Sequence, residues 1–362
     1  MAFLSDDVEL LRTLPSVVLA TGYVDVFYAY PGLPARDGTL RQELDALSDD
    51  VRPLVTLFLL GDPVAPATIE RALGTPLVTA LERLRVLLRG PDGSIQTAGM
   101  CMIPFDGHLV LLPAPRHAPV ALFGDDTLAL AARLAPPSGG RCLAIGAGPG
   151  TFALGLARRT DHVVLLDDQS VALACAELNI VMNGLDERVS LRAGLEALEA
   201  HETFDYIAAN PPPLPFPGEL FESPAGDMER SASERVVRAL PSLLRERGRA
   251  QLVGADLGDE HGPLTARALA EIAPRHGLSA ALTITCHAPL ERDSRLLVSL
   301  AQHTARAGVL SAGEAIERMV AHLDRVRCDR VHLFALTVTR GVRTPGLVVS
   351  RPDVFGGGYW TR

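Results

Sequence analysis

The chain has 362 residues, of which 34 are basic and 43 acidic, giving a formal net charge of −9. Every basic residue is an arginine, which excludes chemistry that needs a lysine, such as a Schiff base or a P-loop. With 48% hydrophobic and 21% charged residues, the composition is typical of a globular protein and not of a disordered one. At this length we expect two domains.

The charge balance and the cysteines bear on partners and location. A net negative charge provides no broad attraction to phosphate backbones or anionic membranes, so a nucleic-acid partner is disfavoured and a membrane is not expected. No apolar run reaches the roughly 18 residues of a membrane span. The five cysteines form no CxxC pair, which favours reduced thiols over disulfides or a zinc site. The sequence therefore predicts a cytoplasmic protein without a metal.

Residues 1–118 are predicted to form a small helical domain that ends in a β-hairpin. Apolar periodicity and helix-start signals predict helices within residues 10–20, 40–47, 51–60, 66–73 and 76–88. Strands are expected over 94–104 and 108–112, with Asp106 and Gly107 as the turn. Helices followed by a hairpin resemble a winged-helix unit. Such a unit can bind DNA, dimerise or hold a substrate, and the acidic chain favours the last two roles.

A proline-rich connector at residues 113–119 separates this domain from a second one, 119–362. Strands and helices alternate there, which predicts an α/β fold with a doubly wound, Rossmann-like sheet. A helical insertion is expected near 292–327. The predicted strands cover residues 141–146, 163–167, 189–192, 206–209, 250–254, 280–286 and 331–339.

A glycine-rich turn follows the first predicted strand. Gly146, Gly148 and Gly150 would let the backbone turn sharply and approach a ligand closely. Asp167 ends the next strand, where a carboxylate can accept hydrogen bonds from a ribose diol, and Asp168 follows it. The spacing departs from GxGxxG, which disfavours a dinucleotide. The alternatives are a plain tight turn and acids that cap a helix.

Asn210 follows the apolar strand at 204–209 and stands before three prolines. An amide held by rigid prolines at the carboxyl end of a strand can accept a hydrogen bond from a substrate N–H, and neighbouring backbone carbonyls can accept a second. Two such acceptors would orient a planar nitrogen toward a methyl donor. The alternative is a loop in which Asn210 caps a helix.

In this order, the motifs of residues 120–255 resemble those of class I S-adenosylmethionine-dependent methyltransferases of the NPPY type. That subgroup includes the glutamine-N5 methyltransferases of release factors and the guanine-N2 methyltransferases of ribosomal RNA. The segment Ala176-Glu-Leu-Asn-Ile-Val-Met-Asn-Gly-Leu resembles the family's helix after the ribose-binding acid. The resemblance implies that S-adenosylmethionine is the cofactor and S-adenosylhomocysteine the product. It also implies that Gly146, Gly148 and Asp167 bind the cofactor, while Asn210 and the Pro211 carbonyl hold the target nitrogen.

Three positions depart from the family pattern. Ala144 replaces an acid two residues before the first glycine, and Gly194 and Leu195 replace an acid expected after the third strand. Pro213 replaces the aromatic residue that stacks on a flat acceptor. Stacking would then come from elsewhere, such as Phe216 or Phe221, or be missing.

The segment after the motif points to a cationic acceptor. Glu219, Glu222, Asp227 and Glu229 lie there with no basic residue before Arg230, and paired carboxylates bind a guanidinium well. The leading hypothesis is therefore an N-methyltransferase for a small, arginine-like molecule, with Glu219 and Glu222 in the site. A solvated acidic loop remains the alternative. Other open functions are ribosomal RNA guanine-N2 or protein glutamine-N5 methylation, and DNA binding beside a vestigial enzyme domain. A homodimer is also expected.

Overall fold

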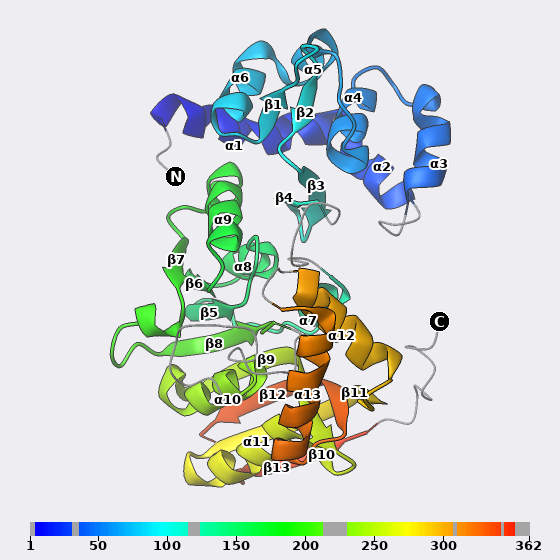
Figure 1. Ribbon diagram of the computed structural model, residues 1–362. Coiled ribbons are helices and arrows are strands. Elements are labelled where there is room, and N and C mark those ends of the chain that lie inside the picture. The colour runs from blue at the N-terminus through cyan, green and yellow to red at the C-terminus, as the bar shows by residue number, and fades with distance from the viewer. Residues whose placement is uncertain are drawn as a thin grey trace. The chain divides into compact units, whose positions relative to one another are not determined.

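The computed structural model describes residues 4–30, 36–114, 124–212, 230–306, 310–341 and 344–351. Its helices and strands are labelled in Figure 1. The chain forms two compact units. Unit 1 comprises Met1–Gly124, Ala147–Arg158 and Asp167–Ala193, and unit 2 comprises Asp125–Gly146, Arg159–Leu166 and Gly194–Arg362. The domain boundary at residue 118 stays a prediction.

Unit 1 combines short helices and two antiparallel β-hairpins with two helices and a strand from later in the chain. The hairpins pair β1 with β2 and β3 with β4. The helical elements are α1 (Ser5–Ala20), α2 (Tyr23–Ala29), α3 (Arg36–Glu43), η1 (Leu44–Ala46), α4 (Arg52–Val55), η2 (Thr56–Leu60), α5 (Pro66–Leu73), α6 (Thr75–Arg83), α8 (Thr151–Ala157) and α9 (Ser170–Met182). The strands are β1 (Leu87–Arg89), β2 (Ile95–Thr97), β3 (Met100–Phe105), β4 (His108–Pro113) and β7 (Val189–Ala193).

Two predictions in this region are wrong in detail. The helix expected up to residue 88 ends at Arg83, because Arg85 adopts a left-handed backbone (φ 57°) and the following residues form β1. The strand expected over 94–104 is two strands from different hairpins, separated at Gly99 (φ 73°). The second hairpin is confirmed, and its turn places Asp106 and Gly107 at positive φ as a two-residue turn requires.

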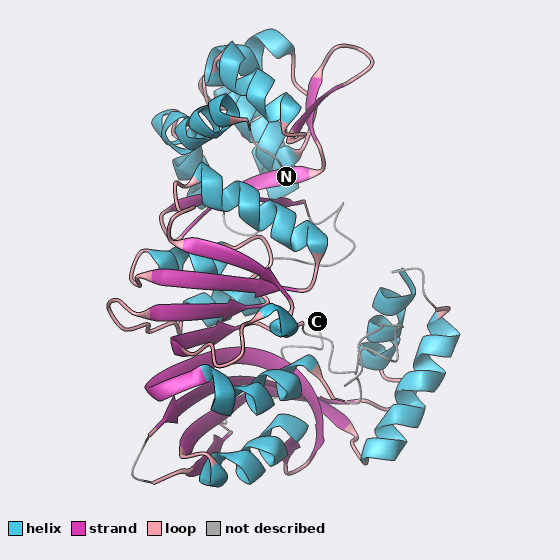
Figure 2. Ribbon diagram, turned by 90° about the vertical axis from the view of Figure 1, so that its left-hand side faces the viewer, coloured by secondary structure: helices cyan, strands magenta, loops and turns pink. Residues whose placement is uncertain are grey.

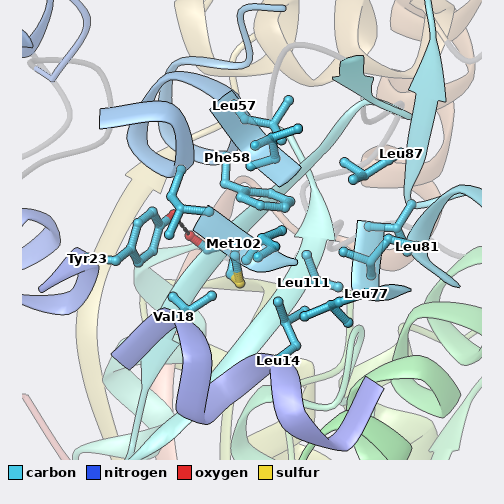
Figure 3. Packing of buried hydrophobic residues seen from close by; sticks show 14 of the residues in the cluster. Leu14, Val18, Tyr23, Leu57, Phe58, Leu77, Leu81, Leu87, Met102 and Leu111 are labelled. Atoms are coloured by element: carbon cyan, nitrogen blue, oxygen red, sulfur yellow. Dashed lines mark hydrogen bonds between the residues drawn. The ribbon is translucent and has the colours of Figure 1, made fainter. Parts of the chain in front are cut away.

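The core of unit 1 joins the helices to the second hairpin. Figure 3 shows Leu14, Val18, Phe58 and Leu111 in one cluster with Tyr23. The Tyr23 hydroxyl donates a hydrogen bond of 2.7 Å to the carbonyl of Met102. Helix α9 contributes Leu178 and Met182 to the same core. The hairpin and α9 are thus packed into one hydrophobic cluster with the N-terminal helices.

Unit 2 contains a mixed sheet in the order β13-β11-β12-β9-β8-β5-β6. Neighbours β6, β5, β8 and β9 run parallel, whereas β12 is antiparallel to both β9 and β11. The strands are β5 (Arg141–Ile145), β6 (His162–Asp167), β8 (Phe204–Ala209), β9 (Leu244–Asp259), β10 (Gly262–Pro263), β11 (Leu278–Pro289), β12 (Arg330–Arg340) and β13 (Gly346–Ser350). The helical elements are α7 (Asp125–Ala131), η3 (Leu195–Ala197), α10 (Ala232–Leu243), α11 (Leu264–Arg275), α12 (Arg295–Arg306) and α13 (Ala312–Val326). This confirms the predicted α/β class.

Alternate side chains of the strands face different helices, as the two-residue period of a strand requires. Leu252 of β9 and Phe334 of β12 pack with α10 and α11, whereas Leu257 and Val331 of the same strands pack with α12 and α13. Both helix pairs are visible beside the sheet in Figure 2. Helices α12 and α13 occupy the segment in which a helical insertion was expected.

In the described part of the chain, no single helix is long and apolar enough to cross a membrane. Helices α1 and α2, which meet at a bend of 58°, reach the length and apolar composition of a membrane span only when they are counted as one segment.

Candidate active site

In unit 1, the glycine-rich loop leads directly into helix α8. Gly148 and Gly150 have positive φ angles of 54° and 91°, which favour glycine at both positions. The Gly150 amide donates to the Ala147 carbonyl over 2.9 Å, and α8 begins at Thr151. The loop is therefore a tight turn whose backbone N–H groups lie at the start of a helix, as expected from the sequence.

Asp167 is fixed against this loop. Its Oδ2 accepts a hydrogen bond of 3.0 Å from the Gly148 amide, and its Oδ1 accepts one of 2.9 Å from the Gln169 amide. The side chain is 8% exposed, and burial raises the pKa of the carboxyl group although both amides act to lower it. Each carboxylate oxygen can accept a second hydrogen bond. The side chain can thus still accept from a ribose hydroxyl. Asp168, the other predicted acid, is exposed.

The same loop holds a buried hydroxyl without a hydrogen-bond partner among the described residues, Oγ1 of Thr151. Buried polar groups are rarely left in this state, so the atom marks a place where a ligand can supply the partner. Together with the turn and Asp167, this chemistry fits a nucleoside that carries a diol. Thr151 was not predicted as a site residue.

In unit 2, Gly146 and Asn210 lie in direct contact. A Cβ atom added at Gly146 would stand 2.3 Å from the backbone oxygen of Asn210, which explains why glycine is needed there. Backbone hydrogen bonds of 2.9 Å run from Gly146 N to Leu166 O and from Asn210 N to Ile145 O. The first glycine of the loop and the predicted catalytic asparagine are therefore positioned together by β5 and β8.

The Asn210 side chain is held by α7. Its Nδ2 donates to Oδ2 of Asp126 over 3.0 Å and lies 3.4 Å from Oγ1 of Thr127. Because a carboxylate can only accept, these contacts decide which end of the amide faces α7. The carbonyl oxygen Oδ1 is thereby left to face another partner. Asp126 and Thr127 were not singled out from the sequence, since an acid and a threonine before an apolar run look like an ordinary helix start.

The remaining predicted site residues have different outcomes. Pro211 is buried directly after Asn210, and Pro212 is exposed. Glu219 and Glu222, and with them Pro213, Phe216 and Phe221, lie outside the described residues. At the position where an acid was expected after the third strand, Gly194 has φ 80°, and a Cβ there would stand 2.3 Å from the Glu196 carboxylate. Glu196 therefore folds back onto this turn.

The described residues contain no group of three or more histidine, cysteine, aspartate or glutamate side chains that could hold a metal ion. The loop of unit 1 has instead the chemistry of a nucleoside-binding turn. The loop after β8 in unit 2 presents an oriented amide.

Comparison with known families identifies this part of the chain. Residues 123–266 match the family model described as methyltransferase small domain. Over these residues the chain is similar to a methyltransferase domain. The match supports the expected class I methyltransferase, an enzyme that uses S-adenosylmethionine, for this segment of the chain.

Curated relatives match over a shorter stretch. The tRNA1(Val) (adenine(37)-N6)-methyltransferases of Escherichia coli O139:H28 (strain E24377A / ETEC) and of strain K12 / DH10B are each 42% identical over 96 residues. The match covers 25% of this chain and 39% of those proteins, so the chain spans about two fifths of their length.

Solved structures with a similar chain course include TYW2 of M. jannaschii in complex with AdoMet, with a TM-score of 0.40 and 10% identity, covering 68% of this chain and 91% of that one. Trm5 of Methanocaldococcus jannaschii in complex with adenosine has a TM-score of 0.38 and 8% identity, covering 68% and 57%.

Proposed function

We propose that the protein transfers a methyl group from S-adenosylmethionine to a planar nitrogen of its acceptor. The observation that carries this proposal is the fixed amide of Asn210, whose Nδ2 donates to Asp126. An amide with a fixed orientation presents one acceptor oxygen, and a planar amino group offers the matching N–H donor. An asparagine that orients the acceptor is what the resemblance to the NPPY subgroup implies. We propose in addition that the N-terminal residues form a domain that binds the acceptor or dimerises.

The cofactor supplies an electrophilic methyl group on a sulfonium, and Gly146, Gly148, Gly150, Thr151 and Asp167 would hold it. The protein's own task is to orient the acceptor. Oδ1 of Asn210 and the carbonyl of Pro211 would each accept a hydrogen bond from one N–H group of the acceptor amine. This arrangement would direct the nitrogen lone pair toward the methyl carbon. The acceptor nitrogen would form the new C–N bond to the methyl group that the cofactor gives up as its C–S bond breaks, and would then release a proton to solvent.

The first acceptor to consider is the exocyclic amino group of a nucleobase. The curated relatives are named for methylation of adenine at N6, and that nitrogen carries two N–H donors in one plane. The same geometry fits the guanine-N2 and glutamine-N5 acceptors implied by the sequence resemblance.

A guanidinium is the second candidate acceptor, and the acidic segment favours it. Glu219 and Glu222 follow the asparagine motif in a stretch without basic residues, and two carboxylates can bind a guanidinium in bidentate fashion. For this reason we retain a small cationic substrate as a proposal. A homodimer and a cytoplasmic location also remain proposals, for the reasons given in the sequence analysis.

A long polynucleotide is less favoured than a small molecule or a short RNA element. Several arginines of the N-terminal region already pair with acids, such as Arg12 with Asp186 at 2.9 Å and Arg83 with buried Asp7. Such arginines are less available for phosphate groups. This weakens the case for DNA binding by a winged helix beside a vestigial enzyme domain.

The test is a methyl-transfer assay with labelled S-adenosylmethionine and a panel of acceptors: adenosine, transfer RNA, ribosomal RNA, a glutamine peptide, arginine and other guanidines. We expect transfer to the nitrogen of one class and its loss in Asn210→Ala. If a guanidine is the acceptor, Glu219→Gln or Glu222→Gln should raise its KM, whereas the same variants should leave a nucleobase acceptor unaffected. Methylation of carbon or oxygen, or full activity of Asn210→Ala, would contradict the proposal.

A further inference from the structure

The turn of the second hairpin is tightly packed on helix α8. The Asp106 carbonyl accepts a hydrogen bond of 3.0 Å from Nη1 of Arg158. A Cβ added at Gly155 would stand 2.2 Å from the Asp106 carboxylate, so α8 has a glycine where the turn crosses it. The hairpin of β3 and β4 is thus in close contact with the helix that begins at the cofactor loop.

Strand β4 is bound to helix α9 by two asparagines. Asn179 is fully buried, accepts from the Leu111 amide over 2.8 Å and donates to the Leu111 carbonyl over 2.7 Å. Asn183, one turn later, donates to the Leu109 carbonyl over 2.8 Å. In this way side-chain amides replace a neighbouring strand along one edge of β4.

Asn179 makes one contact that distinguishes it from Asn183. Its Nδ2 also donates to the carbonyl of Pro149, over 2.9 Å. Pro149 lies between Gly148 and Gly150 in the cofactor loop and has no N–H of its own, so its carbonyl is its only backbone hydrogen-bonding group. Gly148 is bound on the other side by Asp167. The loop is therefore held between Asp167 and Asn179.

A purely structural reading explains part of this arrangement. Buried asparagines commonly satisfy backbone groups, and two of the three Asn179 hydrogen bonds do no more than that for Leu111. The third bond is different, because it holds a loop in which glycines with positive φ angles stand on both sides of Pro149. The same side chain thus links this loop to the hairpin.

We propose that Asn179 is a positioning residue for the cofactor, and that it makes the hairpin of residues 100–113 a structural part of the cofactor-binding loop. This inference rests on the binding of S-adenosylmethionine under the proposed function. It implies that the affinity for the cofactor depends on a contact with the N-terminal region as well as on Asp167. A ligand that moves the hairpin would change cofactor affinity, and by linkage the cofactor would change the affinity for that ligand.

The test compares Asn179→Ala with Asn183→Ala by calorimetric titration of S-adenosylmethionine and by steady-state kinetics. Both variants remove hydrogen bonds from α9 to β4, and only the first frees Pro149. We expect Asn179→Ala to weaken cofactor binding by about tenfold and to raise the KM for the cofactor more than it lowers kcat, while Asn183→Ala stays within about twofold. Equal cofactor affinity in the two variants would overturn the proposal. If the wild-type protein itself does not bind S-adenosylmethionine, it is the proposed function that fails.

Asn179→Asp is the second variant, in case the alanine variant does not fold. It keeps the shape of the side chain and an acceptor for the Leu111 amide, and when protonated it can donate to a carbonyl. Ionised, it directs a charged oxygen toward the Pro149 carbonyl. Relative to wild type, its cofactor affinity should therefore fall as the pH rises from 6 to 8. A ratio of affinities that does not change with pH would count against the positioning role.

Discussion

Asn210 and Asp126 are joined by a hydrogen bond of 3.0 Å from amide Nδ2 to carboxylate Oδ2. Asn210 belongs to the loop after β8, whereas Asp126 lies in the first turn of α7. Since a carboxylate accepts from Nδ2 and not from Oδ1, this bond selects one of the two amide orientations. The catalytic proposal for Asn210 thus depends on a residue far away in the sequence.

Removal of Asp126 should release the Asn210 amide. In Asp126→Ala we expect kcat to fall by about tenfold, because the Asn210 amide can then rotate. In the rotated form its N–H groups face the substrate N–H, and no hydrogen bond forms between two donors. Asp126→Asn should retain more activity, since its own carbonyl oxygen can still accept from Nδ2. The rates of methyl transfer at saturating acceptor decide this. An alanine variant as active as wild type would mean that α7 does not orient the amide.

Asp167→Ala should weaken S-adenosylmethionine binding by at least about tenfold. The variant loses an acceptor for the ribose and also the hydrogen bond that holds Gly148. The exposed neighbour provides the comparison: Asp168→Ala should cause a smaller loss. Both dissociation constants can be measured by calorimetry without knowledge of the acceptor. Normal affinity in Asp167→Ala would reject the assignment of this residue to the site.

The sequence predicts the sheet of unit 2 better than the region around the hairpins. Strands such as β5 and β6 are apolar runs bounded by glycine and aspartate, a pattern that has few other structural solutions. The segment after Arg83 keeps a helical apolar pattern, yet Arg85 turns left-handed so that Leu87 and Ile95 can join the core and β1 can pair with β2. Tertiary packing overrides local propensity in that case.

The residues that sequence reasoning missed at the site act through tertiary contacts. In the sequence, Asp126 looks like an ordinary residue at a helix start and Asn179 like one in a helix interior. Their neighbours in the sequence do not indicate that Asp126 contacts Asn210 or that Asn179 contacts Pro149. Gly146 and Asp167 were predicted because a position at the carboxyl end of a strand itself suggests a role. Strand β13 was also missed, since it follows the long β12 without a pattern of its own.

The contact between Gly146 and Asn210 can be tested with a matched pair of glycines. Gly146 and Gly184 have nearly the same backbone, φ 64° and 65°, but an added Cβ meets the Asn210 oxygen at 2.3 Å in one case and nothing within 4 Å in the other. Both alanine variants carry the strain of a left-handed residue, about 1 kcal/mol. Only Gly146→Ala should also displace Asn210, lowering kcat by at least about tenfold. Similar activities in the two variants would show that strain, and not the collision, matters.

Asp256 and His332 form a register pair on β9 and β12 and should affect stability with opposite signs. Burial raises the pKa of Asp256 to about 6 although Thr265, Ser231 and Leu257 donate to it, and burial lowers the pKa of His332 to about 4. Between pH 4 and 6 the folded protein keeps a proton on Asp256 that the unfolded chain releases, so this contribution to stability is lost as the pH rises. His332 stays neutral in the folded protein at pH values where the unfolded chain binds a proton there, so the contribution of His332 to stability is lost as the pH falls from 6.5 toward 4. Each shift corresponds to about 3 kcal/mol.

Because these contributions oppose each other over pH 4–6, single variants should separate them. Relative to wild type, Asp256→Asn removes the first and should gain stability as the pH rises from 4 to 6. His332→Gln removes the second and should lose stability over the same interval. Urea unfolding at several pH values measures both slopes, with each variant's own value at pH 7 as the reference, so that the cost of the altered hydrogen bonds cancels. Profiles of both variants that run parallel to wild type would mean that neither group keeps its shifted pKa in the folded protein.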